Sequence, residues 1–147
     1  MRNLILGVAQ NYTFEQLRLF IGSLGRVGYG GAVCLFLKDV EESTQQTLRG
    51  CGVQVAPIGP QFPPPGAGVV AFRYWLYQWF LREHGERFDQ VMLSDTRDVF
   101  FQRDPFDFPL GDSLCCFEED PSRTLGTCPF NSQWIRSALD RKSTRLN

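Results

Sequence analysis

The sequence predicts an α/β fold in which a mostly parallel sheet is flanked by helices. Short apolar runs, typical of strands buried on both faces, alternate along the chain with segments whose apolar residues recur at helical spacing. This alternation predicts parallel strands joined by right-handed crossovers through helices. A length of 147 residues, of which 43% are hydrophobic, suffices for one domain with a buried core.

The first strand and the first helix are expected over residues 4–8 and about 13–26. Residues 4–8 form a continuous apolar run. Thr13, followed three residues later by Gln16, makes a capping-box pattern that predicts the start of a helix. The apolar residues that follow recur at helical spacing and are Phe14, Leu17, Phe20, Ile21 and Leu24.

Two further strands and a weaker helix come next. Residues 28–31 are rich in glycine and predict a turn, after which residues 32–37 form a second apolar run. Asp39, with Glu42 three residues later, predicts the cap of a helix that ends at Gly50. Residues 51–56 are the third expected strand, and the proline-rich residues 57–68 are expected to form a loop.

An aromatic segment predicts a third helix over about residues 69–84. We expect one face of this helix to pack into the core through Phe72, Trp75, Leu76, Trp79 and Phe80. Residues 91–93 predict the fourth strand, and residues 114–117 predict a further short one.

The composition excludes several classes of protein. Fifteen basic and 16 acidic residues leave a net charge of −1, which argues against a nucleic-acid partner held by phosphate attraction. One histidine excludes multi-histidine zinc sites, and five cysteines without CxxC spacing fit neither a disulfide framework nor a zinc knuckle. No apolar run approaches the roughly 20 residues that span a bilayer, so no transmembrane segment is expected in this sequence.

Two aspartates follow the fourth expected strand. Ligands of open parallel sheets bind at the carboxyl ends of the strands, where Asp95 and Asp98 are expected to lie. Two carboxylates so placed can hold Mg²⁺ or Mn²⁺, which in turn bridges the phosphates of a nucleotide. The alternative is structural: Asp95 caps a turn, and Asp98 pairs with Arg97 or Arg103.

A longer pattern surrounds this acidic pair. Arg73 lies on the aromatic helix, the segment Phe-Asp-Gln-Val at 88–91 leads into the strand, and apolar residues follow Asp98. Residues 72–101 thereby resemble the central block of nucleotide-sugar-dependent glycosyltransferases of the GT-A fold. The layout is most similar to the glycogenin-like and the bacterial lipopolysaccharide galactosyltransferase-like families. In those families the two motif aspartates are two residues apart, whereas Asp95 and Asp98 are three apart.

The resemblance implies a set of ligand contacts. Asp98, with Asp95, would bind Mn²⁺ or Mg²⁺, and Asn11 and Tyr12 would contact the nucleoside. Arg73 would contact the diphosphate–sugar end of the donor. So would Asn131, which lies in a segment that resembles the Phe-Asn-Ala/Ser-Gly motif, although Gln133 replaces its glycine.

The implied reaction transfers a hexose from a nucleotide diphosphate sugar, foremost a UDP-sugar, to a glycan, protein or lipid acceptor. Catalytic residues are not identified by the sequence. One alternative is a non-catalytic α/β nucleotide-binding or scaffolding domain. A second is a phosphohydrolase of the haloacid dehalogenase type, but that family expects Asp-x-Asp followed directly by Thr or Val near the amino terminus.

The last eight residues, DRKSTRLN, resemble the translation of a sequencing adapter. We therefore expect residues 1–139 to be the nucleotide-sugar-binding part of a single GT-A-type domain, and the natural protein to continue beyond them. The sequence does not identify the compartment; the options are the cytoplasm, or the lumen of the Golgi or endoplasmic reticulum if an anchor precedes this sequence.

Overall fold

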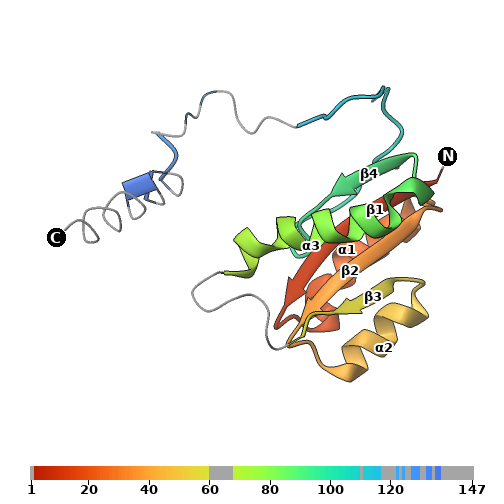
Figure 1. The fold of residues 1–147 in the computed structure, drawn as a ribbon. Helices are drawn as coiled ribbons and strands as arrows, with labels where there is room; N and C mark the ends of the chain where they lie inside the picture. The colour runs from red at the N-terminus through yellow and green to blue at the C-terminus, as the bar shows by residue number, and fades with distance from the viewer. Residues whose placement is uncertain are drawn as a thin grey trace. The chain divides into compact units, whose positions relative to one another are not determined.

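The computed structural model describes residues 2–59, 68–109 and 111–116, and later in the chain residues 122, 124, 127–129, 132–133 and 135–136. The chain divides into two compact units, Met1–Pro109 and Leu110–Asn147. The first unit contains a four-stranded, fully parallel sheet with helices packed on both faces (Figure 1). The predicted α/β class with a parallel sheet is confirmed for this unit.

The elements follow one another as the apolar runs predict. In chain order they are β1 (Asn3–Gln10), α1 (Phe14–Arg26), β2 (Ala32–Lys38), α2 (Glu42–Gly50), β3 (Gln54–Pro57), α3 (Val69–His84), the short 3₁₀ turn η1 (Gly85–Arg87) and β4 (Gln90–Leu93). The strands lie in the order β3-β2-β1-β4, so β1 and β2 are central and β4 is at one edge.

The central strands are buried on both faces, and their side chains alternate between two core clusters. Ile5 and Leu35 belong to the cluster that α1 and α2 cover, hereafter the α1 side of the sheet. Leu4 and Phe36 belong to the cluster that α3 covers, hereafter the α3 side. In the register, Leu4 lies beside Val91 of the edge strand β4, so the Val91 side chain lies on the α3 side of the sheet. The period of two explains why both central strands read as unbroken apolar runs.

Helix α1 begins and packs as its sequence predicts. The Thr13 N–H donates to the Gln16 side-chain oxygen at 2.9 Å, which is the reciprocal half of a capping box. Toward the end of the helix, the buried Ser23 hydroxyl accepts a hydrogen bond from the Phe101 N–H at 3.0 Å. Phe101 also packs edge-on against Phe20, with ring centroids 5.5 Å apart. The segment after β4 is thereby fixed to α1.

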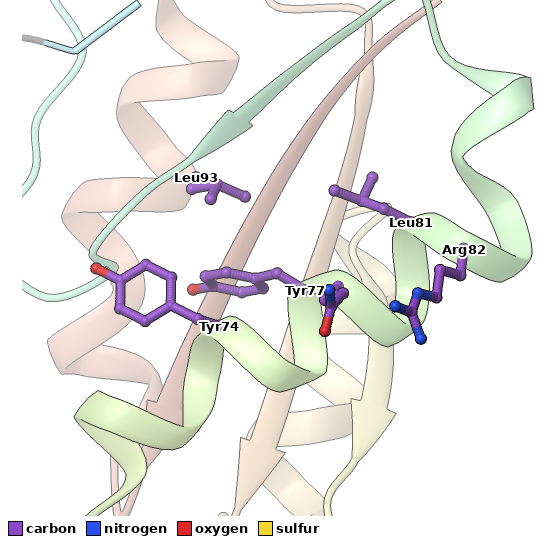
Figure 2. Close-up of a pocket in the computed structure, with 6 residues that line it drawn as sticks. Tyr74, Tyr77, Leu81, Arg82 and Leu93 are labelled. Carbon is purple, nitrogen blue, oxygen red and sulfur yellow. The ribbon is translucent and has the colours of Figure 1, made fainter. Parts of the chain in front are cut away.

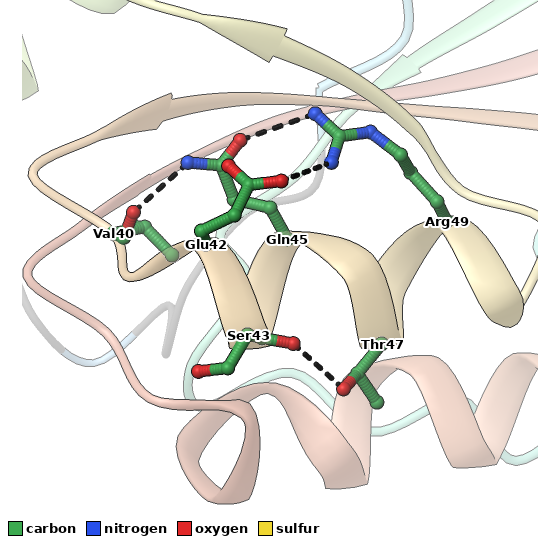
Figure 3. A network of polar contacts seen from close by, with 6 residues as sticks. All are labelled: Val40, Glu42, Ser43, Gln45, Thr47 and Arg49. Atoms are coloured by element: carbon green, nitrogen blue, oxygen red, sulfur yellow. Dashed lines mark hydrogen bonds and ion pairs between the residues drawn. The ribbon is translucent and has the colours of Figure 1, made fainter.

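Helix α2 begins differently from the prediction. Its N-cap position is Glu41, which makes no side-chain cap, and Asp39 instead has the left-handed φ of 51°. The first turn is stabilised from within the helix, because the Gln45 side chain donates to the Val40 carbonyl at 2.9 Å. The Arg49 guanidinium then donates to the Gln45 side-chain oxygen at 3.2 Å and to the carboxylate of Glu42 at 3.1 Å (Figure 3). Glu42 lies one turn before Gln45.

Helix α3 meets the sheet with only part of the predicted face: Phe80 is buried and Leu76 packs against the same cluster, as predicted, but the tryptophans do not. Tyr77 and Phe80 are buried against Phe36 of β2, whereas Trp75 and Trp79 are 68% and 57% exposed. Each helical residue advances about 100°, so Trp79 projects about 200° away from Tyr77. The helix carries aromatic residues on all sides, and the pattern therefore did not determine which side meets the sheet. The predicted burial of both tryptophans is wrong.

The second unit is described only in part. Residues 114–116 form no strand and are exposed, which contradicts the predicted strand there; Phe117 lies outside the described residues. Further on, Thr124 and Thr127 exchange hydrogen bonds, and the Ser132 N–H donates to the Cys128 carbonyl at 2.9 Å. In the described part of the whole chain, every helix is too short or too polar to cross a bilayer.

Candidate functional site

The candidate site lies at the edge of the sheet where its parallel strands end. Directly after β1, Asn11 has a left-handed φ of 55°, which asparagine tolerates better than most residues, and its N–H donates to the Lys38 carbonyl at 3.0 Å. Tyr12 is half-buried beside it. The guanidinium carbon of Arg97 lies 5.9 Å from the centre of the Tyr12 ring. The loops after β1 and β4 are therefore neighbours, as the topology predicts.

The loop after β4 is attached firmly to β1. The Ser94 N–H donates to the Leu6 carbonyl at 3.0 Å, which extends the β1–β4 ladder by one residue. The buried Thr96 hydroxyl then donates to the Val8 carbonyl at 3.0 Å. Gly7 makes room for this contact, since a Cβ atom there would overlap the Cγ2 atom of Thr96 and come within 2.9 Å of Leu35. The exposed residues on either side of Thr96 are thus held on a fixed backbone.

Asp95 is paired with an arginine from the third helix. The Arg73 Nη1 donates to the Asp95 Oδ1, and the two side chains are 24% and 58% exposed respectively. The same guanidinium donates through Nη2 to the Tyr74 hydroxyl at 3.3 Å and lies 5.1 Å from the centre of that ring. Two residues that the resemblance assigns to ligand binding are therefore in direct contact. An arginine from α3, rather than a turn that it caps, is the partner of Asp95.

Asp98 is exposed and lies three residues after Asp95 on the same loop. Among the residues that the structure describes, no ion pair involves Asp98, and the two arginines considered for it stack elsewhere. Arg97 lies over Tyr12, and the guanidinium carbon of Arg103 is 4.2 Å from the centre of the Phe108 ring. The structural role suggested for Asp98, an ion pair with a neighbouring arginine, is therefore not seen.

One cavity adjoins the Arg73–Asp95 pair, and a second shares three of its lining residues, Tyr74, Tyr77 and Leu93. The smaller measures about 110 Å³ and is lined by Arg73, Tyr74, Tyr77, Leu93, Ser94 and Asp95. The larger is an open groove of about 500 Å³ lined by Tyr74, Tyr77, Gln78, Leu81, Arg82 and Leu93. In Figure 2 the two tyrosine rings project from α3 toward the end of β4, beneath Leu93. The polar pair thus lies at one end of an aromatic and aliphatic groove.

The electrostatics of this region favour charged Arg73 and neutral Tyr77. Partial burial works to lower the pKa of the Arg73 guanidinium, but the hydrogen bonds to Tyr74 and Asp95 outweigh burial and raise it. Burial raises the pKa of Tyr77 to about 12. The Arg73 Nε atom is buried and has no hydrogen-bond partner. This guanidinium N–H lies next to a cavity and lacks an acceptor, and an anionic oxygen is the acceptor that would suit it best.

Two carboxylates are what this edge offers to a metal ion. Within the described residues, no three His, Cys, Asp or Glu side chains gather into a potential metal site. Asp95 and Asp98 are hard oxygen donors of the kind that Mg²⁺ and Mn²⁺ prefer, and Asp95 already binds a cationic group. By donor type, these carboxylates suit a metal ion whose other ligands would have to come from water and substrate phosphates. Asn131, the remaining predicted contact, lies outside the described residues.

The sequence analysis missed the residues that support this edge. Tyr77 follows Arg73 by one helical turn, and this spacing places both on the side of α3 that faces the sheet. Gly7 interrupts an otherwise apolar strand, which is a known sign of close approach by another part of the chain. Its partner Thr96 lies between the two aspartates, and its burial has no signal in the sequence.

The fold and this edge define the chain as an α/β protein with a parallel sheet and an acidic–basic pair where its last strand ends. Comparison with protein-family models, with curated proteins and with solved structures gives no match.

Proposed function

We propose that the chain is the nucleotide-sugar-binding part of a metal-assisted glycosyltransferase of the GT-A type. The observation that carries the proposal is the Arg73–Asp95 pair beside a cavity at the carboxyl end of β4. Parallel α/β sheets bind their ligands at this end. Here one guanidinium suited to phosphate, one paired carboxylate and the exposed Asp98 share a short stretch of surface next to the loop of Tyr12.

Each residue has a defined task in this proposal. Asn11 and Tyr12 contact the nucleoside. Asp98, with Asp95, binds Mn²⁺ or Mg²⁺. Arg73 binds the diphosphate and so helps to orient the bond between the sugar and its leaving group.

The metal ion, when bound, stabilises the negative charge that develops on the leaving diphosphate. The bond between the anomeric carbon and the diphosphate oxygen breaks, the acceptor oxygen forms the new bond to that carbon, and the acceptor's proton passes to the departing diphosphate or to water. The chain's own contribution is positioning and charge stabilisation, which suits an edge with no histidine among the residues placed there.

Thermal unfolding with UDP and Mn²⁺ tests the proposal. Ligand at about 100 times its Kd should stabilise the fold by about 2.7 kcal/mol and raise the Tm by several degrees. The rise should require both components and should be lost in Asp98→Asn. The matched control is Asp107→Asn, which changes another exposed aspartate of the same segment and should keep the rise. Absence of any shift with nucleoside diphosphates and either metal would refute the proposal.

A second candidate is a nucleotide-binding or scaffolding domain without catalysis. The pairing of Asp95 with Arg73 favours it, because a neutralised carboxylate can serve structure alone. The same thermal experiment separates the two functions. A binding domain of this kind would be stabilised by nucleotide without metal, and its response would survive Asp98→Asn.

A further inference from the structure

The Arg73–Asp95 pair bears directly on how a metal ion reaches this site. The Arg73 Nη1 contacts Asp95 Oδ1, and Nη2 contacts the Tyr74 hydroxyl. The guanidinium therefore already occupies an oxygen of one of the two carboxylates proposed to bind metal. A divalent cation at either oxygen of Asp95 would lie close to this guanidinium, whose positive charge opposes its binding.

The contacts of Arg73 also show what can displace it. Its Nε is buried without a hydrogen-bond partner, whereas Nη1 and Nη2 are engaged. The guanidinium group presents its N–H donors in a planar fork that matches phosphate oxygens. The cavity of about 110 Å³ lies against the same side chain. A diphosphate at this edge of the sheet would give the guanidinium more acceptors than Asp95 does.

We propose that Arg73 is a latch that excludes the metal ion from Asp95 until a nucleoside diphosphate draws the guanidinium away. This inference rests on the proposed function and goes beyond it. The metal ion and the diphosphate bind well only together, because each removes an obstacle to the other. The cation alone must compete with Arg73, and the diphosphate alone leaves Asp95 without a counter-ion.

Thermodynamic linkage makes the latch measurable. If UDP raises the affinity for Mn²⁺ by some factor, then Mn²⁺ raises the affinity for UDP by the same factor, commonly about 5- to 150-fold in coupled sites. Part of any such coupling comes from direct contact between metal and phosphate. The latch contributes the remainder, which is the part that depends on Arg73.

Calorimetric titration of Mn²⁺, with and without UDP, is the decisive experiment. It compares the unaltered chain with Arg73→Met and with Arg97→Met. Both substitutions remove one positive charge near the aspartates, but only Arg73 contacts Asp95. Without UDP, Arg73→Met should bind Mn²⁺ about 5-fold or more tightly than Arg97→Met, and its coupling to UDP should fall by a similar factor.

The outcomes separate the latch from the proposed function. If UDP and Mn²⁺ bind cooperatively but Arg73→Met behaves like Arg97→Met, the latch is wrong and the glycosyltransferase proposal stands. If Arg73→Met gains Mn²⁺ affinity although no variant binds UDP, Arg73 does exclude the metal, and the glycosyltransferase proposal is wrong. If no variant binds Mn²⁺ under any condition, both are overturned.

A second measurement uses the unaltered chain and does not depend on how a variant folds. The Nε–H resonance of Arg73 in a ¹⁵N spectrum reports whether that donor is engaged, with Mg²⁺ replacing the paramagnetic Mn²⁺. The resonance should shift when UDP and Mg²⁺ are added together and remain in place with Mg²⁺ alone. A shift with Mg²⁺ alone, or none with both, contradicts the latch.

Discussion

The two faces of the sheet differ in how completely they are covered. On the α1 side, Ile5, Leu17 and Phe20 are fully buried, and Phe101 closes the cluster from the segment after β4. The α3 side also has a buried centre, but its outer part leaves Tyr74 at the groove and Val91 and Leu93 of β4 exposed. Stability is therefore concentrated on the α1 side, while the groove and the candidate site lie toward the α3 side and the edge strand.

The largest expected effect comes from truncating a buried aromatic side chain on the α1 side and comparing it with the truncation of an exposed one on α3. Phe20→Ala should destabilise the fold by about 3–5 kcal/mol, because it empties a fully buried position that packs on Phe101. Trp75→Ala removes a larger side chain but one that is mostly exposed, and should change stability by less than about 0.5 kcal/mol. Urea unfolding followed by circular dichroism measures both. Equal losses in the free energy of unfolding would contradict the difference in burial between Phe20 and Trp75.

An intermediate effect is expected where the loop after β4 crosses β1. Gly7→Ala should cost about 2–3 kcal/mol, because the new methyl group overlaps Thr96 and crowds Leu35. The matched control is Gly22→Ala in α1, where a Cβ meets no atom within 4 Å; it should stabilise by about 0.4–1 kcal/mol.

The contact with Thr96 can be isolated by a double variant. Thr96→Ser removes the methyl group that the new Cβ would overlap but retains the hydroxyl that bonds Val8. Combining it with Gly7→Ala should therefore recover part of the loss. Denaturant midpoints of the four chains give the interaction energy. Strict additivity of the two substitutions would refute the proposed contact.

The smallest effect concerns the pH dependence of the buried centre of the α3 side. Burial raises the pKa of the Cys34 thiol from 9.0 to about 11. Because the unfolded chain ionises first, the contribution of Cys34 is fully present below pH 9 and is lost as the pH rises from 9 to 11. At pH 10 the unaltered chain should have lost about 1 kcal/mol relative to Cys34→Ala, compared with pH 7.5.

Urea midpoints of the two chains at pH 7.5 and 10 measure this difference, since every other ionisable group is the same in both of them. A difference that is constant with pH would contradict the burial of an ionisable thiol at that position.

The order and type of the helices and strands in the first unit were predictable from sequence, because its strands are apolar runs and α1 has a single apolar stripe. The face of α3 was not predictable, since its aromatic residues surround the helix. The pairing of Arg73 with Asp95 joins residues 22 positions apart and depends on how α3 lies across the sheet. The acidic pair itself was found because it directly follows a strand, whereas its metal-binding role remains a prediction.

The absence of a side chain at Gly7 has a consequence for how this protein can change over evolution. Thr96 occupies the space that any other residue at position 7 would need, and Thr96 lies between the two aspartates. Sequences related to this one should therefore vary at positions 7 and 96 together. The residues allowed at the edge of the sheet would thus depend on Gly7, which lies in the middle of a strand.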